Sequence, residues 1–80
     1  MTKYYAVVCS VFDEDGNRIE SIEASGSTSL SEARRDKNEL AAAIQSGEYD
    51  EYYFPEYGQS IAAEIEVHDD ENYNLLEIIE

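Results

Sequence analysis

The amino-terminal part of the chain has the alternation that is typical of paired strands. Residues 3–12, KYYAVVCSVF, carry apolar side chains at both alternating sets of positions, which predicts a strand buried on both faces and central in its sheet. Residues 13–17, DEDGN, predict a hairpin turn in which the Asp-Gly pair supplies positive φ angles. A weaker and more polar second strand is expected over residues 18–24, RIESIEA.

The next segment has the start and stop signals of a helix. Ser29 and Glu32 fit a capping box, in which the Ser29 hydroxyl accepts from the Glu32 amide and the Glu32 carboxylate reaches back. Gly47 is a natural residue to end the helix, so we expect it over residues 30–45. The stripe that faces the sheet is expected to contain Leu30, Ala33, Lys37, Leu40, Ala41 and Ile44, with the Lys37 methylenes lying along it.

The second half of the chain returns to strands after an irregular segment. Residues 48–59, EYDEYYFPEYGQ, fit neither period and contain Pro55 and Gly58, which predicts a loop. Residues 60–67 alternate cleanly as a strand, residues 68–72 read as a turn, and residues 73–79 form the last strand. The order β-β-α-β-β predicts one α+β domain over residues 1–80, an antiparallel sheet of about four strands with one helix packed on a face.

The chain is strongly acidic, and its charges are distributed unevenly between its two halves. Nineteen Asp and Glu face five Lys and Arg, for a net charge of −14. Residues 1–40 hold all five cations against eight acids, a balance of −3, whereas residues 41–80 hold eleven acids and neither Lys nor Arg, a balance of −11. Such a field repels nucleic acid and anionic membrane and attracts basic surfaces.

The remaining composition points to a cytoplasmic protein with a thin core. Cys9 is the single cysteine, so no internal disulfide forms and a reducing compartment is expected. No stretch approaches the roughly 20 apolar residues of a membrane span, and the first residues do not read as a signal peptide. A chain of 80 residues buries only about 60–65% of its unfolded surface, so a homodimer stays open as a way to bury more.

Candidate chemistry is sparse. His68 is the single histidine and falls in a predicted turn beside three carboxylates, where an exposed histidine is expected. Cys9 lies in an apolar strand and lacks the cationic surroundings of a reactive thiolate. The segment 13–17 lacks the ligand ladder of a calcium loop, and no phosphate-binding or zinc spacing occurs. We therefore expect no catalytic residue, no cofactor and no metal, and thus not an enzyme.

Two acidic clusters are the candidates for binding a partner. The segment 48–57 combines four acids with five aromatics, and tyrosine is typical of interface hot spots. The outer face of the third strand and the following turn carry a row of carboxylates at a spacing of about 6.6–6.8 Å, similar to phosphates along a nucleic-acid strand. The candidate partner-binding residues are Glu48, Tyr49, Asp50, Glu51, Tyr52, Tyr53, Glu56, Tyr57, Glu64, Glu66, Asp69, Asp70 and Glu71, with Glu77 as a further member of the outer face.

In size, charge and Tyr-rich acid clusters such as EYDEYYFPEY, the chain resembles phage-encoded nucleic-acid mimics, the anti-restriction proteins and some anti-CRISPR proteins. The resemblance is to the class and matches no motif residue by residue. It implies a stoichiometric inhibitor in the host cytoplasm that occupies a basic nucleic-acid-binding surface of a defence complex. An immunity or antitoxin protein that neutralises a basic toxin needs the same surface, and an ordinary acidic domain of a halophile is a third reading.

Overall fold

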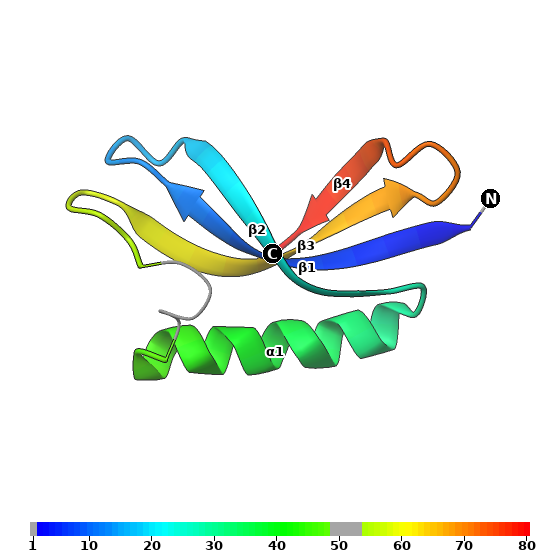
Figure 1. The fold of residues 1–80 in the computed structure, drawn as a ribbon, viewed down its shortest axis with the longest axis horizontal. Helices are drawn as coiled ribbons and strands as arrows, with labels where there is room; N and C mark the ends of the chain where they lie inside the picture. The colour runs from blue at the N-terminus through cyan, green and yellow to red at the C-terminus, as the bar shows by residue number, and fades with distance from the viewer. Residues whose placement is uncertain (1, 49–53) are drawn as a thin grey trace.

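The computed structural model describes residues 2–48 and 54–80 of the chain (Figure 1). One helix lies across one face of a four-stranded sheet, which confirms the predicted α+β architecture. The sheet has the order β2-β1-β3-β4, and each neighbouring pair is antiparallel. The elements are β1 (Lys3–Phe12), β2 (Arg18–Ser27), α1 (Leu30–Ser46), β3 (Ser60–Asp69) and β4 (Leu75–Ile79).

Local signals define the ends of α1, although one of them works differently from the prediction. The Ser29 hydroxyl accepts from the Glu32 amide at 3.4 Å, as expected. The Glu32 carboxylate does not reach back to the Ser29 amide, because Ser27 stands between them. The Ser27 hydroxyl accepts from the Ser29 amide at 2.9 Å and donates to Glu32 at 2.8 Å. Gly47 ends the helix with a φ of 83° and donates to the Ile44 carbonyl.

The main core lies between α1 and the sheet face that it covers. Val7 and Cys9 of β1 and Ile65 and Val67 of β3 pack there with Ala33 and Leu40 of α1, together with half-buried Leu30 and Ile44. Ala41, which was expected on the same stripe, is exposed. Burial raises the pKa of the Cys9 thiol, so this side chain stays protonated and serves as a small apolar core residue.

The other face of β1 is also buried, although α1 does not cover it. Ala6 and Ser10 are 0% exposed and Val8 is 2% exposed, which confirms the prediction of a central strand buried on both sides. The β1–β2 and β3–β4 hairpins curve away from α1, so this face of the sheet is concave (Figure 1). We call it the concave face, and the side chains that close it come from the hairpins themselves.

Three strand boundaries differ from the prediction. β2 continues to Ser27, β3 continues to Asp69, and β4 begins only at Leu75. The longer β3 places His68 within a strand instead of a turn. Tyr73, expected in the last strand, has a φ of 56° and belongs to the preceding turn, where its amide donates to the Asp69 carbonyl at 2.7 Å.

Gly47→Ala is expected to destabilise the fold by about 1 kcal/mol, because a residue with a Cβ pays roughly 1–2 kcal/mol in the left-handed conformation. Chemical denaturation monitored by circular dichroism measures this cost. Gln45→Ala, on the exposed side of the same last turn, is the control and should change the unfolding free energy by less than about 0.5 kcal/mol. Equal midpoints for the two variants would contradict the role assigned to Gly47.

Candidate interaction surface

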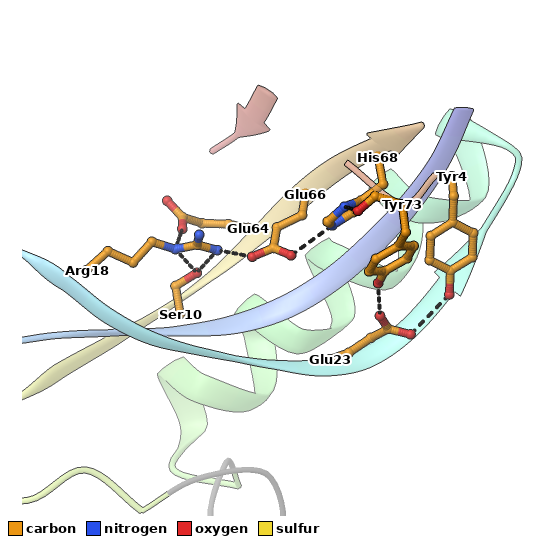
Figure 2. Close-up of polar contacts among 8 residues, drawn as sticks. All are labelled: Tyr4, Ser10, Arg18, Glu23, Glu64, Glu66, His68 and Tyr73. Carbon is orange, nitrogen blue, oxygen red and sulfur yellow. Dashed lines mark hydrogen bonds and ion pairs between the residues drawn. The ribbon is translucent and has the colours of Figure 1, made fainter. Parts of the chain in front are cut away.

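The centre of the concave face is occupied by an arginine from β2 that reaches across to β3 (Figure 2). The Arg18 guanidinium lies 2.6 Å from Glu66 Oε2 through Nη2 and 3.5 Å from Glu64 Oε1 through Nε. It also donates from Nε and Nη2 to the Ser10 hydroxyl of β1, at 3.2 and 3.1 Å. One cation therefore ties together three neighbouring strands.

The expectation that Glu64 and Glu66 belong to an exposed row of carboxylates on β3 is therefore wrong. Glu64 is 6% exposed, and Glu66 is half-buried. Glu64 Oε1 is buried without a hydrogen bond, so its contact with Arg18 at 3.5 Å acts through charge and not through hydrogen-bond geometry. Two carboxylates placed this deep need a cation beside them, and Arg18 meets that need.

His68 continues the same chain of contacts along β3. Its Nε2 lies 3.0 Å from Glu66 Oε1, its Nδ1 lies 3.3 Å from the Tyr73 carbonyl oxygen, and its ring stacks on Tyr73 at 4.1 Å. His68 is only 6% exposed, so the expectation of an exposed turn histidine is wrong. The Glu66 carboxylate can only accept, so His68 donates from Nε2 in that contact.

The charge of Glu66 follows from these partners. Burial raises the pKa of this carboxyl, but hydrogen bonds from His68, Arg18 and Ser21 outweigh it, and the pKa ends below its ordinary value. Glu66 is thus ionised at neutral pH. Arg18 is the cation shared by Glu64 and Glu66, so the centre of the concave face presents less negative charge than two free carboxylates would.

A second set of contacts closes the end of the concave face next to the β3–β4 turn (Figure 2). The Glu23 carboxylate of β2 accepts from the hydroxyls of Tyr4 and Tyr73, both at 3.0 Å. Burial and the Glu23 carboxylate raise the pKa of Tyr73 to about 12. Gly26 permits this arrangement, because a Cβ there would fall 1.7 Å from the Tyr4 hydroxyl. Glu23 thereby joins the two hairpins.

The turn of the β1–β2 hairpin forms the first acidic tip of the molecule. Asp13 Oδ1 accepts from the amides of Asp15 and Asn17, both at 2.9 Å, and the bond from Asn17 is the main reason that the pKa of Asp13 is lowered. Glu14 and Asp15 are exposed. The 54–59 loop lies against this turn, since a Cβ on Gly58 would fall 2.6 Å from Glu14 Oε1. The first acidic tip consists of Asp13, Glu14, Asp15, Glu56 and Tyr57.

The turn of the β3–β4 hairpin forms the second acidic tip, defined as Asp69, Asp70 and Glu71. Asp69 Oδ1 accepts from the Glu71 amide at 3.0 Å, which fixes the turn. Asp70 and Glu71 are exposed, and Asp69 is half-buried opposite Lys3 in the register of β1 and β3. The two hairpins flare on the same side of the sheet toward opposite ends of the molecule (Figure 1), whose longest extent is 40 Å.

The candidate binding residues chosen from the sequence lie on different parts of the structure. Glu48, Glu56 and Tyr57 are exposed, Tyr57 completely. Glu77 pairs with Val67 on the face that α1 covers and so does not belong to the concave face. The segment Tyr49, Asp50, Glu51, Tyr52 and Tyr53 lies outside the described residues. From the sequence, Asp13, Glu14 and Asp15 were assigned only to a hairpin turn, and their place on an acidic surface was missed.

Within residues 2–48 and 54–80, no group of three or more His, Cys, Asp and Glu side chains is arranged to hold a metal ion. None of the helices described is long and apolar enough to cross a membrane. Comparisons with protein-family models, with curated proteins and with solved structures find no match. The surface itself therefore carries the functional argument.

Arg18→Met is expected to lower the unfolding free energy by about 3 kcal/mol, because it leaves two largely buried carboxylates without their cation. Arg35→Met is the matched control. Arg35 lies 3.8 Å from Glu32 and 3.9 Å from Asp36 but is 66% exposed, so its loss should cost less than about 1 kcal/mol. Urea denaturation at neutral pH compares the two variants, and equal costs would contradict the central role of Arg18.

Glu23→Gln is expected to move the pKa of Tyr73 down from about 12, because the neutral amide no longer disfavours the tyrosinate beside it. Tyr73 has a raised pKa in the fold, so its contribution to stability is complete below about pH 10 and is lost as the pH rises toward the folded value. Alkaline titration of tyrosinate absorbance measures the shift, with Tyr73→Phe identifying the Tyr73 component. A Tyr73 component that titrates identically in the wild type and Glu23→Gln would refute the contact.

Proposed function

We propose that this chain is a non-catalytic acidic binding protein that occupies a basic, nucleic-acid-binding surface of another protein. The observation that carries the proposal is the excess of exposed, uncompensated carboxylates. Of 19 acidic residues, Asp50 and Glu51 lie outside the described residues, which leaves 17, and 12 of these are exposed. Among those 17, only Glu32, Asp36, Glu64 and Glu66 lie within 4.0 Å of an arginine.

The density of this charge is comparable to that of nucleic acid. Fourteen net negative charges over a longest extent of 40 Å amount to one per about 2.9 Å. A nucleic-acid single strand carries about one charge per 3.4 Å, and a duplex carries about one per 1.7 Å of its axis. A basic channel built for either polymer would therefore find a comparable field on this protein.

The acidic tips, and not the expected row on β3, are the parts that support contact with such a channel. The central carboxylates Glu64 and Glu66 are buried or half-buried against Arg18, whereas Glu14, Asp15, Asp70 and Glu71 are exposed, so the partner meets these four first. Tyr57, fully exposed beside Glu56, adds a ring on which an arginine can stack. The resemblance to anti-restriction and anti-CRISPR inhibitors enters here as part of the proposal: the partner would be a nucleic-acid-binding component of a defence complex.

Charge reversal at the tips tests this proposal. The partner is first isolated from a lysate of the source cells with the immobilised wild-type protein and then titrated with variants. Glu14→Lys with Asp15→Lys, and Asp70→Lys with Glu71→Lys, should each weaken binding at least about tenfold at 0.15 M salt, since close charge pairs across an interface couple by 1.5 kcal/mol or more. Asp13 is left intact because it holds its turn.

The control is Glu32→Lys with Glu39→Lys, which makes the same change in net charge on the exposed side of α1. It should weaken binding less than about threefold, because charges farther than a Debye length of about 8 Å from the contact are screened. Circular dichroism verifies that each variant is folded. If the helix variant weakens binding as much as the tip variants do, the acidic tips are not the binding surface.

A further inference from the structure

The edge strand β4 leaves apolar side chains in solvent. Leu75 is 50% exposed, Leu76 is 47% exposed and Ile78 is 38% exposed. In the part of the chain that the structure describes, β4 is the last strand of the sheet, so its outer backbone groups are also free to pair. An edge strand of this kind is a template for another strand.

The opposite edge, β2, is built differently. Its pairing with β1 has register shifts at two places, between Val7 and Val8 and between Val11 and Phe12, and it carries the exposed acids Glu20 and Glu23. Bulges and charges of this kind protect an edge from further pairing. β4 also has a register shift in its pairing with β3, between Val67 and His68, but it pairs regularly from Glu77 to Ile79 and leaves that part of its outer edge for a new strand.

The space beside β4 on the helix side carries more positive than negative side chains, although the protein as a whole is acidic. A groove of about 330 Å³ is lined by Arg34, Lys37 and Asn38 of α1 and by Ile65, Ile79 and Glu80 of the sheet. Two of the five cations of the chain thus line this groove. A strand that alternates acidic and apolar side chains would place acids beside Arg34 and Lys37 and apolar side chains along the exposed edge.

We propose that β4 pairs antiparallel with β4 of a second copy, and that Glu77 of each copy lies against Arg34 and Lys37 of the other. The strand has the required pattern: Glu77 and Ile79 face the helix side opposite Val67 and Ile65, and Ile78 faces the concave side opposite Glu66. A two-fold axis at Ile78 brings Ile78 against Ile78 of the second copy, Glu77 against Ile79 and Leu76 against Glu80, so Ile78 is the exposed apolar residue that the pairing covers at its centre. The two Glu77 carboxylates do not pair directly.

The net charge gives this dimer a distinctive salt dependence. Each copy carries −14, so long-range repulsion opposes association at low ionic strength and is screened as salt is added. The dimer therefore tightens with salt, whereas binding of the acidic tips to a basic partner weakens with salt. The dimer does not depend on the proposed function, and the opposite salt responses distinguish the two.

Sedimentation equilibrium of the full chain at about 0.1 and 0.5 M salt tests the proposal, since these conditions bracket strong and weak screening. We expect a monomer–dimer equilibrium whose dissociation constant falls severalfold at the higher salt. Ile78→Lys should raise that constant at least tenfold. Arg34→Glu should do the same, and combining it with Glu77→Arg should restore much of the loss by reversing the pair.

Arg35→Glu is the matched control, because it changes the net charge equally but lies outside the groove. At 0.5 M salt the Debye length is only about 4–5 Å, so a charge outside the groove is screened from it. This variant should therefore leave the dissociation constant within about twofold of the wild-type value. A wild-type protein that stays monomeric under both conditions would overturn the proposal and leave the edge to a strand of a different protein. Equal weakening by Arg34→Glu and Arg35→Glu, or a dimer that survives Ile78→Lys, would also overturn it.

Discussion

The fold depends on the contact of Arg18 with Glu64 and Glu66. A sheet with a helix on one face normally leaves its other face to solvent, but here that face is curved and its central strand is buried. Burial of two carboxylates is costly unless a cation and hydrogen bonds accompany them. Arg18 supplies the cation for both carboxylates and a hydrogen bond to Glu66, because its planar guanidinium reaches both of them and the Ser10 hydroxyl at once. His68 and Tyr73 extend the network to the second hairpin.

This network also determines where the negative charge of the molecule is felt. Glu64 and Glu66 lie buried or half-buried against Arg18 at the centre, so the exposed acids lie at the hairpin turns, on the outer strands, on the helix surface, in the 54–59 loop and near residue 80. The hairpins that carry the acidic tips are joined through Glu23, which accepts from Tyr4 and Tyr73. This joint favours the proposed binding, since a charged surface that is already ordered loses less conformational entropy when it meets a partner.

Most of the fold could be predicted from the sequence, because its signals are local. The apolar run of β1, the Asp-Gly turn and the interval from Ser29 to Gly47 each specify an element through nearby residues. The candidate surface was less predictable. Alternation placed Glu64 and Glu66 on a polar face, but their burial depends on Arg18, which lies 46 and 48 positions earlier in the chain. Net charges counted separately for residues 1–40 and 41–80 do not reveal that Arg18 in the first range pairs with two acids in the second.

The wrong prediction at His68 has the same cause, a contact between distant parts of the chain. A histidine followed by two aspartates and a glutamate resembles a turn locally, but the ten-residue pairing of β1 with β3 carries the strand on to Asp69. Tyr73 then turns back with a positive φ and stacks on the imidazole. Strand length here is decided by the partner strand, which is a tertiary effect that overrides the local turn signal.

The central functional claim is that this protein and nucleic acid compete for one basic surface. An order-of-addition binding experiment tests it most directly: the isolated partner is mixed with this protein before or after a labelled DNA or RNA, and bound nucleic acid is measured. We expect prior addition of the protein to block nucleic-acid loading, and later addition to act only as fast as the nucleic acid dissociates. Simultaneous binding of both, without mutual loss of affinity, would contradict mimicry and favour an allosteric or toxin-neutralising role.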